Sequence, residues 1–335
     1  MSSSLAQTST PRQQPPTGGK ASQRPKVSAR AREERRAAYG LIAPTFLIVL
    51  VMVVVPILWT ISLAFQRVRL INLRQTGFFG TYSFDNFVAV FISPGFAAAL
   101  VNTLVYSVGG TAGAILLGLV AALALRRPFR GRGLIRAALL LPYVAPVVAA
   151  TFVWSTLLNP QFGAINHWGT TLLGWEEAIA FLTSGEDATL FGLDLPISTA
   201  MVTVVLFEAW RSFPFAFLFL TARIEGIPGT LDEAAVVDGA TPLQRFRHIV
   251  WPQLLPTIAV LTVLRFIWTF NNFDDIYLLT GGGSGTQVVA VRVYDFLISR
   301  GNIGAAAAQA LVLAAILAVL VTVYLKLFGR KEEVA

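Results

Sequence analysis

Charged residues inside apolar stretches are the first candidates for chemistry in this chain. Glu208 and Arg211 are three positions apart in one apolar run, a spacing that places both on one face of a helix. Arg265 lies in another apolar run. A charge at membrane depth costs about 2.5–3.5 kcal/mol on insertion scales, so such residues usually face a partner charge or a polar cavity. Two interpretations stay open here: a structural ion pair, and the polar lining of a substrate path.

Other residue types that carry catalysis are scarce. The chain has no cysteine, which excludes a disulfide framework, Cys-ligated zinc and thiol catalysis. Its two histidines, His167 and His248, are far apart in the sequence, which argues against a His-based metal site. The glycine-rich stretch 281–285 lacks the lysine of a P-loop, and we interpret it as a flexible turn. We therefore predict no catalytic residue and no metal site, and rank a membrane-embedded enzyme lowest.

Composition identifies the elements that must position these charges. Of the 335 residues, 55% are hydrophobic and 13% are charged, whereas soluble domains carry about 25% charged residues. About 20 apolar residues cross the hydrocarbon core, and only helices satisfy their own backbone hydrogen bonds there. We predict an all-α integral membrane protein with six transmembrane helices, at about 41–65, 97–125, 137–158, 197–222, 253–271 and 303–325.

Basic residues predict the orientation of these spans. Nineteen of the 26 lysines and arginines lie in the terminal segments and in the loops after the second and fourth spans. By the positive-inside rule, this side is cytoplasmic, so both termini are expected there. The loop 159–196 has no Lys or Arg and is predicted to be external. The loop 66–96 fits poorly, because it should be external but holds three arginines.

The chain is predicted to have two parts. Residues 1–36 are rich in Ser, Pro, Gln and Arg and show no apolar period, which predicts a disordered basic cytoplasmic tail. That tail is a candidate for binding anionic lipid heads. Residues 37–330 form the transmembrane domain, in which 223–252 is a cytoplasmic loop. No folded basic face for nucleic acid is evident.

The loop 223–252 is patterned as two short helices. Thr230 with Glu233 predicts a capping box that starts the first helix, and a glycine is expected to end it. Thr241 with Gln244 predicts a second capping box, with a proline at the first helical position. The sequence therefore predicts a helix, a sharp turn and a second helix on the cytoplasmic face.

This segment resembles the EAA loop of ABC importer permeases. The resemblance rests on Glu233, Ala234, Ala235, Asp238, Gly239, Ile249 and Pro252. The family pattern ends in Ile-x-Leu-Pro, and Trp251 stands here in the Leu place. Flanking motifs are similar to the carbohydrate branch, in particular to the maltose-transporter F-type and glycerol-phosphate A-type subunits: Phe213-Pro214-Phe215, Gly226-Ile227-Pro228, Asn271-Asn272-Phe273 and Leu278-Leu279-Thr280-Gly281-Gly282-Gly283. The resemblance covers roughly residues 38–328.

The resemblance implies an ABC type I importer permease fold and several partners. These are a second homologous permease, a dimer of ABC ATPase subunits that holds ATP and magnesium, an external solute-binding protein and a sugar substrate. No cofactor is expected in this chain, whose place is the bacterial-type cytoplasmic membrane. The implied function is sugar import by alternating access, with the ATPase docking on the helix of Glu233, Ala234, Ala235, Asp238 and Gly239.

The resemblance also implies which residues face the substrate. Carried over by position, they are Glu208, Arg211, Ser212, Phe215, Arg265, Trp268 and Thr269. Asn271 and Asn272, which follow directly, are further candidates. Aromatic faces suit sugar rings, and carboxylate, guanidinium and hydroxyl groups bond sugar hydroxyls. For any single aromatic residue, helix packing is an equal alternative. A second function stays open: a stand-alone ion-coupled transporter with Glu208 or Asp275 as the coupling carboxylate.

Overall fold

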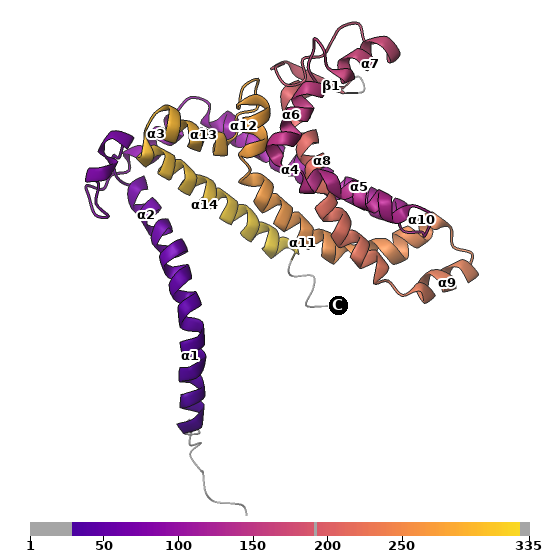
Figure 1. The fold of residues 1–335 in the computed structure, drawn as a ribbon, viewed down its shortest axis with the longest axis horizontal. Helices are drawn as coiled ribbons and strands as arrows, with labels where there is room; N and C mark the ends of the chain where they lie inside the picture. Colours follow the sequence, from indigo (N-terminus) through magenta and orange to yellow (C-terminus); the bar gives the residue numbers. More distant parts are fainter. Residues whose placement is uncertain (1–28, 191–192, 329–335) are drawn as a thin grey trace, which may run out of the picture. The chain divides into compact units, whose positions relative to one another are not determined.

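The structure, a computed structural model, describes residues 29–190 and 193–328. The chain divides into two compact units, residues 1–56 and 57–335, whose helices are drawn in Figure 1. The first unit contains helix α1 (Ala29–Val49), the π-helical turn η1 (Leu50–Val54) and the first residues of α2 (Val55–Ala64).

The predicted disordered tail covers residues 1–36. Its predicted end is wrong, because α1 begins at Ala29. Residues 29–38 are all Ala, Arg or Glu, which are strong helix formers, so the membrane helix extends through them toward the N-terminus. Residues 1–28 lie outside the described part of the chain.

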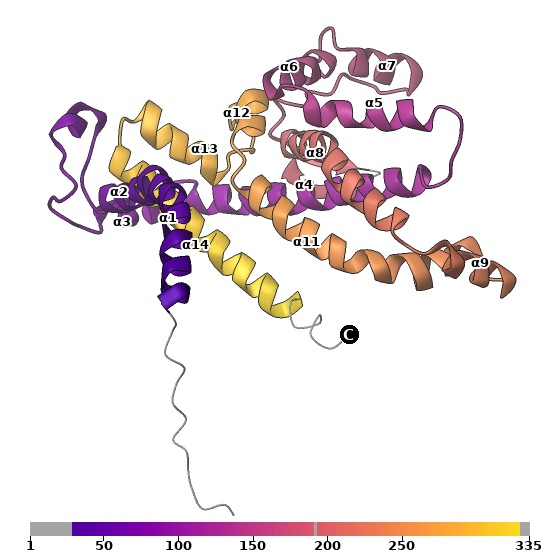
Figure 2. The same ribbon diagram turned by 60° about the horizontal axis from the view of Figure 1, so that its bottom comes forward.

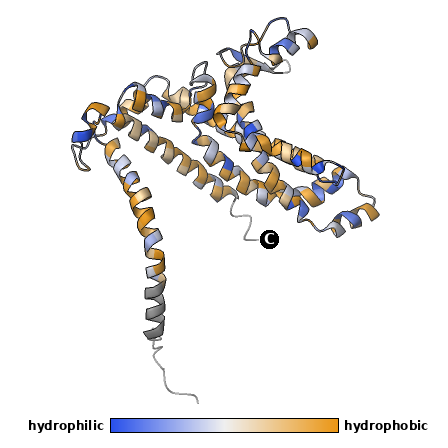
Figure 3. Ribbon diagram, in the orientation of Figure 1, coloured by the Kyte–Doolittle hydropathy of each residue, from blue (hydrophilic) through white to orange (hydrophobic). Residues whose placement is uncertain are grey.

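Five helices in the described residues are long and apolar enough to cross a membrane. Each lies close to a predicted span, and Figure 3 shows one of them, α14 (Ile303–Phe328), as mostly hydrophobic. They cover Ala38–Ala64, Phe96–Ala124, Thr199–Glu225, Pro242–Phe270 and Ile303–Leu327. The fourth is longer than predicted, since α10 (Pro242–Arg245), η3 (Phe246–Val250) and α11 (Trp251–Phe270) follow one another without a break.

The predicted third span, 137–158, is not one helix. It consists of α5 (Arg132–Val144) and α6 (Val147–Leu157), which meet at an angle of 98° (Figure 2). Ala145, which precedes Pro146, is extended, as the residue before a proline usually is. The proline also lacks the N–H that would continue the helix. Counting this bent pair as one span gives six.

Helix α4 (Phe96–Ala124) packs closely against α8 (Thr199–Glu225). Small residues on α4 permit the approach. A Cβ added at Gly113 would lie 2.7 Å from the Ala209 Cβ, and one at Gly118 would lie 2.7 Å from the Phe217 backbone nitrogen. Helices in lipid associate through such small-residue contacts, because lipid gives no hydrophobic driving force between them.

The predicted external loop, 159–196, contains regular structure. Helix α7 (Ala164–Leu172) is followed by the antiparallel pair β1 (Asp187–Leu190) and β2 (Leu193–Ser198). Ser198 then caps α8, accepting a hydrogen bond from the Met201 N–H. The other elements are η2 (Leu70–Gln75), α3 (Asp85–Ile92), α9 (Gly229–Val237), α12 (Asp274–Thr280), α13 (Val289–Tyr294), η4 (Asp295–Ser299) and α14 (Ile303–Phe328).

One of the three arginines that fit the positive-inside rule poorly has an acidic partner. Arg67 donates to the Asp85 carboxylate at the start of α3. This hydrogen bond is the main cause that holds the pKa of Asp85 below its ordinary value. The pair removes one net positive charge from this loop.

Candidate functional site

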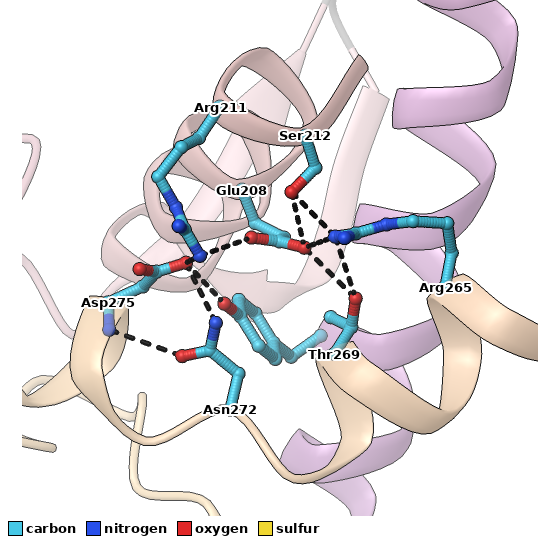
Figure 4. A network of polar contacts seen from close by, with 8 residues as sticks. Glu208, Arg211, Ser212, Arg265, Thr269, Asn272 and Asp275 are labelled. Atoms are coloured by element: carbon cyan, nitrogen blue, oxygen red, sulfur yellow. Dashed lines mark hydrogen bonds and ion pairs between the residues drawn. The ribbon is translucent and has the colours of Figure 1, made fainter. Parts of the chain in front are cut away.

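A buried polar network joins four helices in the second unit (Figure 4). Glu208, Arg211 and Ser212 come from α8, Arg265 and Thr269 from α11, and Asp275 from α12. Helix α4 adds Tyr106, whose hydroxyl donates to Asp275 Oδ2 at 3.1 Å. Asn272 lies in the turn between α11 and α12.

Glu208 is the centre of the first half of the network. Its side chain is fully buried, with 0% of its surface exposed. Its Oε1 pairs with the Arg265 guanidinium and accepts hydrogen bonds from Ser212 Oγ at 3.0 Å and Thr269 Oγ1 at 2.9 Å. The same Arg265 nitrogen also donates to Ser212 and Thr269. The space is tight, because a Cβ added at Gly110 would lie 2.7 Å from Glu208 Cγ.

Asp275 is the centre of the second half and is also fully buried. Its Oδ2 accepts from Arg211 Nη2 at 3.1 Å and from Asn272 Nδ2 at 3.1 Å. Arg211 links the halves, since the same nitrogen lies 3.5 Å from Glu208 Oε2. The side chain of Arg211 is 23% exposed, so this residue connects the buried network to an accessible surface.

The network is electrically balanced, with two carboxylates and two guanidinium groups. Buried charges persist only when they are paired and hydrogen-bonded, and this balance meets that condition. Asp275 Oδ1 and the Nε atoms of Arg211 and Arg265 are buried and lack a hydrogen-bond partner. These atoms can form a hydrogen bond with a new partner, from another part of the chain or from a ligand.

Sequence reasoning placed most of this network among the site candidates and missed two members. The structure brings together six of the predicted site residues in this one network: Glu208, Arg211, Ser212, Arg265, Thr269 and Asn272. Tyr106 was missed because a tyrosine in an apolar helix carries no sequence signal of its partner. Asp275 was considered as a coupling carboxylate of the alternative transporter and not as a substrate-site residue. Asn271 lies apart, because its amide donates to the backbone of its own helix at Ile267.

Aromatic side chains lie beside the network. Trp268 is 47% exposed. Its ring centre lies 5.1 Å from that of Phe215 and 5.7 Å from the Arg265 guanidinium carbon. Phe215 also contacts Phe219 and Tyr143. These rings give the edge of the network an accessible apolar face. That these aromatic residues and the network bind substrate stays a prediction.

The loop that resembles the EAA motif forms the two predicted helices. Helix α9 spans Gly229–Val237 and ends at Asp238, after which Gly239 adopts a left-handed φ of 75°, the conformation that glycine tolerates. Thr241 and Gln244 form the predicted capping box at the start of α10. The capping box predicted at Thr230 is wrong: the helix begins earlier, after Pro228, and has no side-chain cap. A proline pre-sets a helix entry, so the threonine falls inside the first turn.

The predicted coupling residues lie on this helix and at its end. Glu233, Ala234, Asp238 and Gly239 are exposed, and Ala235 is half-buried. Val236 and Val237 are also exposed, at 56% and 87%. This combination of a carboxylate, small residues and apolar side chains on one short helix is suited to contact with another protein.

Comparison with known proteins decides the family. Residues 114–333 match the family model described as "Binding-protein-dependent transport system inner membrane component". The chain belongs to this family. It is 34% identical to the inner membrane ABC transporter permease protein YcjO of Escherichia coli, over 84% of this chain and 90% of that protein. It is 31% identical to the trehalose transport system permease protein SugA of Mycobacterium tuberculosis, over 88% and 90%.

A solved structure supports the fold. The bacterial alginate ABC transporter, in complex with an alginate pentasaccharide-bound periplasmic protein, contains a chain that matches with a TM-score of 0.72 at 24% identity, covering 90% of this chain and 96% of that one. The described helices therefore form the fold of a transporter permease, and the protein crosses the membrane several times. Family membership supports the permease and gives no support to the stand-alone ion-coupled transporter.

Proposed function

We propose that this permease translocates a carbohydrate across the cytoplasmic membrane as one subunit of an ATP-driven importer. The observation that carries this proposal is the similarity, over most of both chains, to permeases named for sugar transport. These include SugA and the trehalose/maltose transport system permease MalF of Thermococcus litoralis, which is 30% identical over 78% of this chain and 83% of that protein.

The proposed importer needs further chains, since this one carries no nucleotide-binding motif. A second permease would complete the path, and two ATPase subunits would hold ATP and magnesium. A solute-binding protein would deliver substrate, as expected for a binding-protein-dependent system. The orientation with both termini in the cytoplasm follows from the distribution of basic residues and puts the loop 223–252 on the ATPase side.

We assign the ATPase contact to α9. This helix is short and largely exposed, and no residue of it is buried, so its surface is available to a partner. Its glycine turn at Gly239 and the capped start of α10 hold the two ends in defined conformations. Closure of the ATPase dimer would move α9, and α10 with α11 would carry that movement into the membrane, where it would open the path in turn to each side.

The substrate contact is assigned to the accessible edge of the network. Phe215 and Trp268 offer ring faces on which a sugar can stack, and Arg211 offers partly exposed hydrogen-bond donors. Glu208, Ser212, Arg265 and Thr269 are buried and would hold this edge in place from behind. Asn272 would act in the same way, through its bond to Asp275.

The coupling assignment is tested by purification of the tagged chain in mild detergent. The wild-type chain should retain an ATPase and a second permease, and the Glu233→Lys variant should lose the ATPase but keep the permease. Glu176→Lys, in the loop predicted to be external, is the matched control and should keep both. Recovery of the wild-type chain alone, in a form that still imports sugar along an ion gradient, would overturn the proposal.

The substrate assignment is tested by uptake into cells that express the complete importer, with radiolabelled trehalose, maltose, maltodextrin and glycerol phosphate as probes. Trp268→Ala should reduce uptake of the transported compound about two- to tenfold, since an aromatic contact contributes about 0.5–1.5 kcal/mol beyond the area that it buries. The control is Trp168→Ala, which changes an exposed ring on α7. Equal uptake by both variants would refute a role for Trp268 in binding.

A further inference from the structure

Helix α9 is attached to the membrane helices in an unusual way. None of its residues is buried, so apolar packing does not fix its position. Its backbone hydrogen bonds at the C-terminal end are local ones, such as those from Gly239 to Val236 and from Ala240 to Ala235. A helix that must transmit movement needs a firmer attachment than exposed side chains and local backbone hydrogen bonds provide.

Asp232 supplies that attachment. Its Oδ2 lies 3.5 Å from Arg126 Nη2 and 3.3 Å from Arg245 Nη1. In the described part of the chain, these are the ion pairs that join α9 to other elements, and no side-chain hydrogen bond from α9 to another element accompanies them. Asp232 is 29% exposed and Arg245 16%, so solvent screens this pairing less than it screens a surface pair.

The two arginines lie at the ends of different membrane helices. Arg126 is the second residue after α4, which ends at Ala124, and Arg245 ends α10, which continues through η3 into α11. These are the helices that contribute Tyr106, Arg265 and Thr269 to the buried network. One carboxylate thus connects α9 with the ends of two of the four helices that contribute to the network.

A hollow adjoins this carboxylate. It has a volume of about 580 Å³ and is lined by Arg126, Arg127, Asp232, Arg245, Phe246 and Val250, among others. Packed side chains therefore do not back α9 on this side. Asp232 Oδ1 and Arg245 Nε are buried without hydrogen-bond partners. Either oxygen of the Asp232 carboxylate can face an arginine. A change in the angle of α9 therefore need not break the ion pairs.

We propose that Asp232 is a positioning residue, and that its pairing with Arg126 and Arg245 is the clamp that carries movement between α9 and the membrane helices. This proposal rests on the proposed function, in which α9 contacts the ATPase. It assigns to Asp232 a role distinct from that of its neighbour Glu233. Glu233 is exposed and pairs with no other described residue, whereas Asp232 pairs with arginines of its own chain.

The test uses distances in the full-length protein. The chain has no cysteine, so Val237→Cys on α9 and Val120→Cys on α4, both exposed, provide two unique sites for spin labels. In lipid nanodiscs, the labelled parent should give one narrow distance distribution. Asp232→Asn should broaden it about twofold or more, because the neutral amide no longer pairs with either arginine, and Asp232→Glu should restore it.

Glu225→Gln is the matched control. Glu225 also lies between two arginines, Arg132 at 3.1 Å and Arg136 at 2.7 Å, but it ends α8 and both partners belong to α5. This variant loses the same charge and should leave the α9 distance distribution narrow. A distribution for Asp232→Asn as narrow as that of the parent would overturn the proposal.

A second measurement separates this proposal from the proposed function. ATP hydrolysis is measured in the complex with the ATPase that co-purifies with the wild-type chain. Asp232→Asn should lower the rate about two- to tenfold, with recovery in Asp232→Glu and no change in Glu225→Gln. If the wild-type chain retains no ATPase, the proposed function fails while the distance test of the clamp still stands. If the ATPase binds and neither distance nor rate changes in Asp232→Asn, the clamp alone fails.

Discussion

Glu208 and Asp232 use the same chemistry in opposite surroundings. Each carboxylate lies between two guanidinium groups on the described helices, Glu208 between Arg211 and Arg265, and Asp232 between Arg126 and Arg245. Glu208 is fully buried, and the backbone of Gly110 and the hydroxyl of Ser212 lie close against it. Asp232 is 29% exposed, beside a hollow, on a helix without buried residues.

The difference shows what surroundings do to an ion pair. A fully enclosed pair cannot change partners without leaving a charge in an apolar medium, so it fixes the helices that share it. A half-exposed pair beside open space can rotate and remain solvated. The same three charges therefore serve as a rigid joint at Glu208 and as an adjustable one at Asp232.

The largest effect is expected when one charge is removed from the rigid joint. Glu208→Gln leaves Arg265 buried without its counter-charge, which should destabilise the fold by about 3–5 kcal/mol. The measurement is the temperature at which the detergent-solubilised protein loses its monodisperse peak in size-exclusion chromatography. An unchanged transition temperature would mean that water reaches Glu208, and the contrast drawn here between Glu208 and Asp232 would be wrong.

A double substitution sharpens the same comparison. Glu208→Leu with Arg265→Met removes both charges and keeps similar volumes, so stability should return to within about 2 kcal/mol of the wild type. Arg265→Met alone, the control, should be as unstable as Glu208→Gln. A folded double variant that no longer imports sugar would show that the charges serve transport as well as folding. If the double variant is the least stable of the three, the pair stabilises the fold by itself.

A smaller effect is expected at the turn that ends α9. Gly239 has a φ of 75° and no atom within 4 Å of an added Cβ, so Gly239→Ala introduces backbone strain of about 1–2 kcal/mol and no clash. Amide hydrogen exchange over residues 229–240 should accelerate. Gly229→Ala is the matched control, since it also meets no atom within 4 Å and has no positive φ. Equal exchange in the two variants would contradict a role for the left-handed turn.

The smallest effect is expected at the exposed pair of Arg67 and Asp85. The guanidinium holds the pKa of Asp85 below its ordinary value, so this pair stabilises the fold above that value and ceases to do so as the pH falls through the lowered pKa. In Arg67→Gln, the carboxyl carbon of selectively labelled Asp85 should titrate at a higher pH, near that of an ordinary aspartate. Arg74→Gln should leave the titration unchanged, and an equal shift in both variants would argue against direct pairing.

Much of the architecture could be predicted from local patterns. Apolar stretches located five of the spans, because membrane helices are defined by length and composition alone. The capping box at Thr241 and the glycine turn at Gly239 were predicted from residues a few positions apart, since their hydrogen bonds are local. The bend at Ala145–Pro146 was missed even though its proline is visible, because prolines are also tolerated inside membrane helices, as Pro214 is in α8.

The sequence by itself determined that this protein crosses the membrane, where its helices run, which family pattern its cytoplasmic loop carries and which charged residues need partners. Only the tertiary structure decided which residues those partners are. Asp275 and Tyr106 join Glu208 and Arg211 from helices far away in the chain, and Asp232 turns to Arg126 and Arg245. The physical reason is that a buried charge requires a counter-charge, which the sequence shows. Which distant residue supplies that counter-charge depends on how closely the helices pack, and here glycines on α4 set the distance between α4 and α8.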